Sequence, residues 1–320
     1  MTVDAATTSF TVRAGAARSL WIIANVHGRR RRRRYAQVIS ALRAFGAELN
    51  VLLVSAPGDA QRHATAACAA WRAGDGPDRL LVAGGDGTVN DAINGLAGAA
   101  LPVGFLPLGS ANVLAEELGL PRDPRALAEV LLFGQPVEVC LGRANGRLFL
   151  LMAGIGIDAE VCDRIHRPLK RYIRQGAYVL TTVSRWLAYR SRRYRVTVDG
   201  QHYEVASALI CNARHYGGPF ISAPDANIAE PVLHVCLFGD PGRFRAIGYM
   251  AGMFLGTVHG MAGFRIVPGT HVTVEAEPDY RGRDPVQGDG DTIAELPVEI
   301  TVAEERLQLV VPDRWSEKIA

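Results

Sequence analysis

The chain has 320 residues and a formal net charge of +3, with 48% hydrophobic and 21% charged residues. This balance excludes a largely disordered chain, and the length favours two domains over one. The small net charge gives no reason to expect nucleic acid as a partner, although six consecutive arginines stand at positions 29–34.

The first part of the chain alternates short apolar runs with amphipathic segments. The expected strands are Leu20–Ala24, Glu48–Ser55, Leu80–Ala83 and Val103–Leu106. The expected helices are Tyr35–Phe45, Ala60–Arg72, Val89–Leu96 and Ala111–Leu118. Strands that alternate with helices predict a parallel sheet with helices on both faces, so residues 1–133 should form a three-layer α/β domain.

The pattern changes near Phe133. Beyond it the expected strands are Val137–Leu141, Leu148–Met152, Arg195–Val198, Val205–Cys211, Val232–Phe238, Val272–Glu275, Val298–Val302 and Leu307–Val311. Two helical stretches interrupt them, Tyr172–Tyr189 and Phe244–Val258, and the apolar side chains of the second favour a place in the core. Alternating strands with few helices predict an antiparallel β-sandwich over residues 134–305.

The run GGDGTVNDAINGL begins at Gly84, where an expected strand turns into an expected helix. Glycine at 84, 85 and 87 permits positive φ and lets a ligand approach the main chain. Thr88 is a plausible N-cap, and the start of a helix suits phosphate. The run lacks the third glycine of GxGxxG and the GK[ST] of a P-loop. Asp86 would repel a phosphate unless a metal bridges them or the carboxylate serves as a base.

A second glycine turn follows the next expected strand, in LPLGSANVLAEELGLP (106–121). Ser110 can cap the helix that follows, and Asn112 can donate to a phosphate or a ribose. Because parallel strands end at the same edge of a sheet, we expect this turn to be the second wall of one pocket.

These two motifs, in this order, resemble the diacylglycerol kinase catalytic family, which includes bacterial lipid kinases and sphingosine and ceramide kinases. The resemblance extends over nearly the whole chain. It includes IIANVHG (22–28), LMAGIGIDAEV (151–161), the following KRYIRQGAYVL, the stretch CNARHYGGPFISAPDANIAEPVLHV, and PVQGDGDTIAELPVEITV. The last contains Asp289-Gly290-Asp291 where the family usually has Asp-Gly-Glu.

The resemblance implies an N-terminal nucleotide domain like those of phosphofructokinase and NAD kinase, and a C-terminal β-sandwich that binds the lipid. The active site would lie in the cleft between them, and residues 306–320 would return to the first domain. Members of the family use ATP and Mg²⁺ to phosphorylate a lipid hydroxyl. Nucleotide-binding residues are then expected at Asn25, Gly28, Gly84, Gly85, Gly87, Thr88, Ser110 and Asn112.

Two aspartates compete for the role of catalytic base. The resemblance favours Asp289, the family's base in bacterial enzymes, with Asp86 as a close partner, whereas the sphingosine kinase branch favours Asp86. Asp291 replaces a glutamate and is the candidate magnesium ligand. Many bacterial members also bind a second metal beside an Asp-Asp-Gly run, but this chain has Glu230 and Pro231 for Asp-Gly and His234 for a later aspartate, so that site is not expected.

The expected location is cytoplasmic. Five scattered cysteines fit a reducing compartment, the sequence MTVDAATTSF lacks the pattern of a signal peptide, and no apolar run reaches the roughly 20 residues of a membrane span. We therefore expect peripheral association with the inner face of the membrane and no nucleic-acid partner, and a homodimer is the candidate assembly. The alternatives are a sphingoid-base or ceramide kinase, an NAD kinase, and a non-catalytic nucleotide- or lipid-binding regulator.

Overall fold

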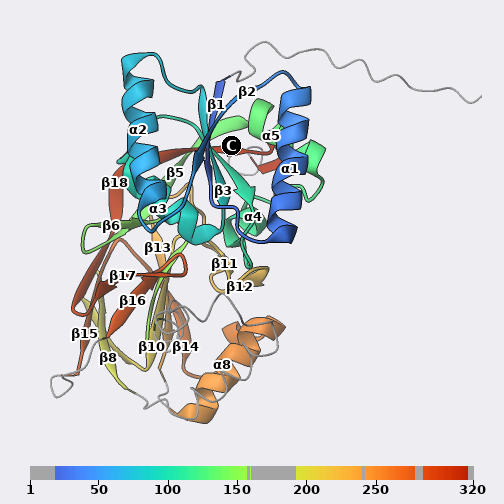
Figure 1. Cartoon of the computed structure of the whole chain (residues 1–320). Coiled ribbons are helices and arrows are strands. Elements are labelled where there is room, and N and C mark those ends of the chain that lie inside the picture. The colour runs from blue at the N-terminus through green and yellow to red at the C-terminus, as the bar shows by residue number, and fades with distance from the viewer. Residues whose placement is uncertain (1–18, 157–158, 160–191, 240–241, 278–283, 316–320) are drawn as a thin grey trace, which may run out of the picture.

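The computed structural model describes residues 19–156, 159, 192–239, 242–277 and 284–315. It confirms an α/β domain with a parallel sheet, followed by an antiparallel β-sandwich domain (Figure 1). The expected helix Tyr172–Tyr189 and Asp158 of the GIGIDA segment lie outside the described residues. Within the part of the chain that is described, no helix is long and apolar enough to cross a bilayer.

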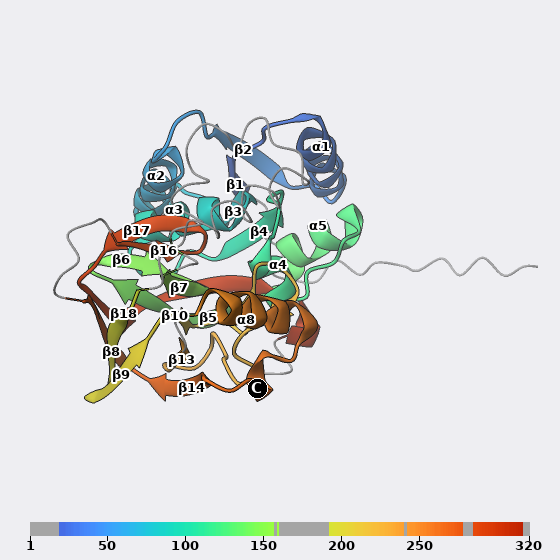
Figure 2. The same cartoon turned by 90° about the horizontal axis from the view of Figure 1, so that it is seen from below.

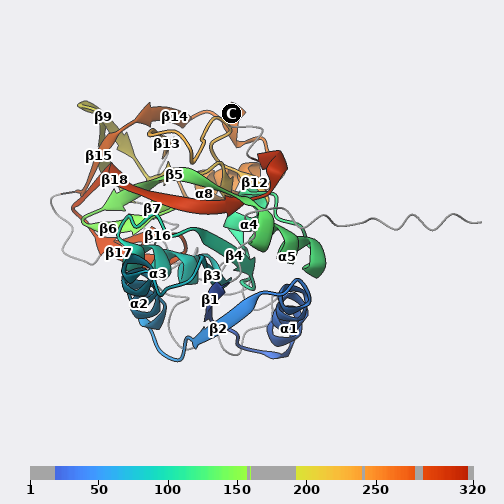
Figure 3. The ribbon, with the colours of Figure 1, turned by 90° about the horizontal axis from the view of Figure 1, so that it is seen from above.

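The α/β domain is built on parallel strands in the order β2-β1-β3-β4. The strands are β1 (Ser19–Ala24), β2 (Glu48–Leu53), β3 (Arg79–Gly84) and β4 (Val103–Pro107). The helices are α1 (Arg29–Ala44), α2 (Asp59–Ala73), α3 (Asp86–Leu96), α4 (Val113–Glu117) and α5 (Pro124–Phe133). Every residue of β3 and β4 is buried, because α2 and α3 cover one face of the sheet and α1 and α5 the other (Figure 3).

Two helices differ from the sequence expectation. Helix α1 begins at Arg29, six residues before the expected start, so the arginine run forms its first turns. Helix α5 was not expected at all, although its start has a clear signal. Asp123 accepts hydrogen bonds from the backbone N–H groups of Arg125 and Ala126, and Pro124 stands at the first helical position, where proline costs no hydrogen bond.

The second domain consists mainly of antiparallel strands. They are β5 (Gln135–Ala144), β6 (Arg147–Phe149), β7 (Met152–Ile155), β8 (Tyr194–Val198), β9 (Gln201–Val205), β10 (Ser207–Cys211), β11 (His215–Tyr216), β12 (Phe220–Ile221), β13 (Leu233–Phe238), β14 (Phe264–Gly269), β15 (His271–Ala276), β16 (Pro285–Gly288) and β17 (Asp291–Glu295). One sheet has the order β14-β13-β10-β7-β16-β17. Helix α8 (Arg243–Leu255) packs beside it and ends at Gly256, and a 3₁₀ turn, Val258–Gly260, follows. The expected strand Val205–Cys211 corresponds to β10, which begins two residues later, and β9 before it was not expected.

Strand β18 (Val298–Val311) is one continuous strand where the sequence predicts two. Its first half pairs antiparallel with β15, from Val298 opposite Val274 to Thr301 opposite His271. From Ile300 to Val311 it also pairs antiparallel with β5, with an irregularity after Val302, and Leu309 pairs parallel with Val103 of β4. The strand therefore runs from the sandwich into the sheet of the α/β domain (Figure 1).

Candidate active site

The two glycine turns meet at the carboxyl edge of the parallel sheet. Strands β3 and β4 are neighbours, and the turn after each runs toward the other. A Cβ on Gly85 would lie 3.2 Å from Gly109 Cα, and a Cβ on Gly109 would lie 2.7 Å from Gly85 Cα. Any side chain at either position would therefore push the turns apart.

Close approach, and not positive φ, explains the glycines of the first motif. The φ angle of Gly85 is −101°, and neither Gly84 nor Gly87 has positive φ, which corrects one reason given for them. A Cβ on Gly84 would lie 2.6 Å from the Thr88 side chain. A Cβ on Gly87 would lie 2.1 Å from Oδ2 of Asp291, so the carboxylate of the second domain lies directly over Gly87.

Asp86 caps a helix that it does not belong to. Its Oδ2 accepts a hydrogen bond from the Val113 N–H, and its Oδ1 accepts one from the Leu114 N–H, both at 3.1 Å. Helix α4 therefore begins on a carboxylate from the preceding motif. The expected caps are wrong: Ser110 is exposed and lies before the N-cap residue of α4, and Thr88 lies inside α3, whose N-cap is Gly85.

Burial raises the pKa of Asp86 to about 6, although the two N–H groups oppose the shift; the nearby charge of Asp289 adds to it. Asp86 is half-buried, and its hydrogen bonds to Val113 and Leu114 leave a lone pair on each oxygen. A partly accessible carboxylate with a pKa close to neutrality suits a general base.

Asp289 stands in the tight turn between β16 and β17, with φ of 51° followed by 88° at Gly290. Its Oδ1 accepts from the backbone N–H groups of Leu151 (2.8 Å) and Met152 (3.1 Å). Its Oδ2 accepts from the Leu150 N–H (2.7 Å) and from Nδ2 of Asn90 (3.0 Å). Burial raises its pKa, and these four donors oppose the shift. Each oxygen therefore already has two donors.

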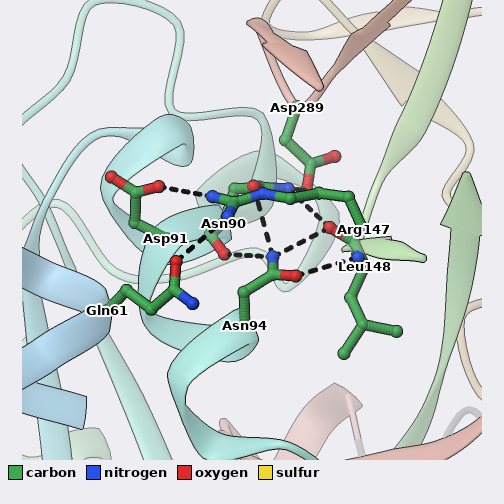
Figure 4. Close-up of polar contacts among 7 residues, drawn as sticks. All are labelled: Gln61, Asn90, Asp91, Asn94, Arg147, Leu148 and Asp289. Carbon is green, nitrogen blue, oxygen red and sulfur yellow. Dashed lines mark hydrogen bonds and ion pairs between the residues drawn. The ribbon is translucent and has the colours of Figure 1, made fainter. Parts of the chain in front are cut away.

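Two asparagines one turn apart on α3 form the other half of this junction (Figure 4). Nδ2 of Asn90 also donates to the Leu148 carbonyl at 3.1 Å. The Asn94 side chain accepts from the Leu148 N–H at 2.9 Å and donates to its carbonyl at 3.0 Å. Arg147 pairs with Asp91 at 2.6 Å. None of these residues was expected at the site from the sequence, although polar residues at i and i+4 of an apolar helix are the signal that marks them.

The remaining predicted nucleotide residues lie around the same turns. Nδ2 of Asn25 donates to Oγ1 of Thr88 at 3.0 Å, which joins the loop after β1 to the first glycine motif. Gly28, with φ of 87°, precedes α1 in a conformation that favours glycine. Nδ2 of Asn112 donates to the Gly109 carbonyl at 3.2 Å, while its buried Oδ1 has no hydrogen-bond partner among the described residues and can accept from a ligand.

The carboxylates suit a magnesium ion that arrives with a nucleotide. Burial raises the pKa of Asp91, Arg147 lowers it, and the charge of Asp291 raises it further. The carboxylates of Asp91 and Asp291 are therefore neighbours. Among the described residues, no group of three or more acidic, histidine or cysteine side chains is arranged to hold a metal. Mg²⁺ commonly binds through one or two carboxylates plus substrate phosphates, and Asp291 beside Gly87 provides such a ligand.

The far end of α4 is bound to the second domain. The buried carboxylate of Glu117 accepts from Nδ1 of His215 at 2.6 Å and from its backbone N–H at 3.1 Å, and Arg214 lies 3.4 Å away. A cavity of about 310 Å³ adjoins this contact. Helix α4 thus contacts Asp86 at one end and strand β11 at the other.

The comparisons with known proteins agree along both domains. Residues 19–144 match the diacylglycerol kinase catalytic domain, and residues 152–311 match the YegS C-terminal NAD kinase beta sandwich-like domain. A diacylglycerol kinase from Mycobacterium tuberculosis is 31% identical over 268 residues, covering 80% of this chain and 83% of that one. A probable lipid kinase, YegS-like, from Pseudomonas putida is 32% identical over 207 residues, or 63% of this chain and 68% of its own.

The solved structures agree in fold. A crystal structure of a diacylglycerol kinase from Bacillus anthracis superposes with a TM-score of 0.70 at 20% identity, covering 94% of this chain and 99% of that one. The motif order, the paired glycine turns and these matches lead to one conclusion. The chain belongs to the diacylglycerol kinase catalytic family of kinases.

Proposed function

We propose that this kinase transfers the γ-phosphoryl group of ATP, in the presence of Mg²⁺, to a hydroxyl of diacylglycerol or a related lipid. The observation that carries the proposal is the position of Asp86. This half-buried carboxylate has a pKa of about 6, belongs to the first glycine turn, caps the helix after the second, and is close enough to Asp289 of the other domain for that charge to raise its pKa.

Asp86 is the better candidate for the base. It would accept the proton of the lipid hydroxyl as that oxygen bonds to the γ-phosphorus and ADP leaves with the electrons of the broken P–O bond. Asp289, the residue that the resemblance favours, is buried, and both its oxygens already accept two hydrogen bonds. We assign it the role of fixing the β16–β17 turn against α3, which holds Asp291 over Gly87.

The glycine turns would hold the nucleotide. Gly84, Gly85 and Gly87 lie at the start of α3, where the free N–H groups of the first helical turn would bind the phosphate oxygens. Asn112 offers its unpartnered Oδ1 to a nucleotide hydroxyl, and Ser110 lies exposed beside it. Bound Mg²⁺ neutralises charge on the phosphates, and Asp291 is the residue that would hold it.

The test is transfer from labelled ATP with Mg²⁺ to diacylglycerol, monoacylglycerol, sphingosine and ceramide in mixed micelles, with NAD as a further acceptor. Asp86→Asn should abolish labelling of the accepted lipid. Asp75→Asn, an exposed carboxylate after α2, is the matched control and should leave labelling unchanged. Labelling of NAD would identify an NAD kinase. ATP binding without any labelled acceptor would identify a regulator, and labelling that survives Asp86→Asn would overturn the site.

A further inference from the structure

We infer that helix α8 and the β11–β12 hairpin form the surface that docks on a bilayer containing anionic lipid. The inference rests on the proposed function, since a kinase for lipids must meet its acceptor at a membrane. The docking surface is defined by five exposed apolar side chains, Ile221, Ile247, Met250, Phe254 and Leu255.

The apolar side chains are concentrated at this place. Five of the seven exposed large hydrophobic residues among those described belong to the docking surface, and the other two, Val51 and Leu53, lie on β2. Leu255 is 76% exposed and Phe254 is 54% exposed. Isolated exposed apolar residues are normal, but a contiguous group of them marks an interaction site.

The group is contiguous because one face of α8 carries exposed apolar side chains, while the apolar side chains of the opposite face are buried. Residues 247, 250 and 254 recur at i, i+3 and i+7 and so share one face of the helix. The opposite face packs Tyr249 and Met253 against Val258 in a small core. The Phe254 ring also meets the Phe220 ring of β12 edge-on, with centroids 4.5 Å apart, which joins the hairpin to the helix. The expectation that α8 is a core helix thus holds for only one of its faces.

Arginines stand in both chain segments that carry the docking surface. Residues 241–274 contain no aspartate or glutamate and three arginines, of which Arg245 and Arg265 are exposed. Residues 213–224 also lack carboxylates and include Arg214. Exposed apolar side chains with arginines in the same segments complement a surface with apolar chains beneath anionic headgroups.

The docking surface is connected to the candidate base. Helix α8 contacts β12 and lies at the lower end of the second domain, toward the viewer when the molecule is seen from below (Figure 2). In the same hairpin, His215 binds Glu117 of α4, whose other end binds Asp86. A bilayer held against α8 would therefore present lipid headgroups beside the hairpin that leads to Asp86, while the acyl chains stay in the membrane.

The experiment measures sedimentation of the full chain with vesicles of phosphatidylcholine alone and with phosphatidylglycerol added. The wild type should bind the mixed vesicles better. The variant Phe254→Asp/Leu255→Asp should weaken binding about tenfold or more. Leu53→Asp alters an equally exposed leucine on β2 and should bind like the wild type. Phosphorylation of a dispersed short-chain diacylglycerol should be unchanged in both variants, because neither alters the candidate active site.

The outcomes separate docking from catalysis. Unchanged vesicle binding by the double variant, or an equal loss in Leu53→Asp, would overturn the docking surface. Loss of short-chain phosphorylation in the double variant would also overturn it, since the helix would then matter to the fold. A wild-type dimer that the double variant converts to a monomer, with vesicle binding unaffected, would assign the surface to a second copy. If the wild type binds vesicles but phosphorylates no lipid, and the double variant does not bind vesicles, the docking surface stands and the proposed function fails.

Discussion

Asn90→Asp should make the stability of this protein depend on pH, because it places a second carboxylate beside Asp289. Nδ2 of Asn90 lies 3.0 Å from Oδ2 of Asp289, and both side chains are buried. Two charges at that separation repel by about 5–6 kcal/mol at an effective dielectric constant of about 20. Keeping one aspartate of ordinary pKa protonated at pH 7 costs about 4 kcal/mol. Protonation is the cheaper response, so the pair should hold one proton.

The sign of the effect follows from where that proton is bound. The folded variant keeps the proton, whereas the unfolded chain releases it above about pH 4. Stability relative to the wild type should therefore fall by about 1.4 kcal/mol per pH unit between pH 4 and pH 7. Near pH 4 the protonated carboxyl can donate to Asp289, so only the hydrogen bond to the Leu148 carbonyl is lost, about 1 kcal/mol.

Urea unfolding of wild type and variant at pH 4.5, 5.5, 6.5 and 7.5 measures this difference. Asn94→Ala is the control, because it removes the neighbouring amide, which bonds backbone groups of Leu148 and Asn90 and the Asn90 side chain, without adding a titratable group. Its cost should change little with pH. A difference between Asn90→Asp and wild type that is equal at pH 5.5 and pH 7.5 would refute the placement of Asp289 against α3.

Three further changes test the site. Asp86→Asn should lower turnover about 10²–10⁴-fold with the fold retained; in the wild type, kcat/KM should rise through about pH 6, as Asp86 loses its proton, and level off above, and a profile without that limb would contradict the role. Gly87→Ala should displace the Asp291 carboxylate, which lies where the new Cβ would be, and abolish phosphoryl transfer. Because alanine has a better helix propensity than glycine, the melting temperature should be nearly unchanged. Retained activity would count against Asp291 as a magnesium ligand. Glu117→Ala should lower the free energy of unfolding, measured in urea, by about 2–4 kcal/mol, because His215 loses its carboxylate partner. The control is Glu116→Ala at the neighbouring, more exposed position, which should cost less than about 0.5 kcal/mol. Equal costs would refute the buried contact.

Local signals in the sequence were enough to predict the α/β domain. The glycine turns, the strands before them and the amphipathic helices are encoded within about ten residues each, and β3, β4 and α3 were expected within two or three residues of their bounds. Helix α5 was also predictable from the sequence, because Asp123-Pro124 is a recognisable helix start.

What the sequence could not show depends on contacts between distant segments. The sequence favours Ser110 as the cap of α4, but Asp86, 27 residues before Val113, accepts hydrogen bonds from the first N–H groups of that helix. The resemblance pointed to Asp289 as base, but its four hydrogen bonds come from residues 137 to 199 positions away. Likewise, no local pattern predicts that β18 continues through the gap between two expected strands, since the partner strands on either side supply the reason.

The path of β18 has a consequence for how the chain is made. Strand β4 is complete at Pro107, yet the strand that pairs with its outer edge begins at Val298. During translation that edge stays unpaired while nearly 200 further residues emerge, and open strand edges invite pairing with other chains. A premature stop anywhere before β18 would remove the strand that joins the parallel strand β4 to the antiparallel strand β15 within one sheet. The nucleotide half of this kinase is therefore not a separable module, and a fragment that ends after α5 should aggregate or be degraded.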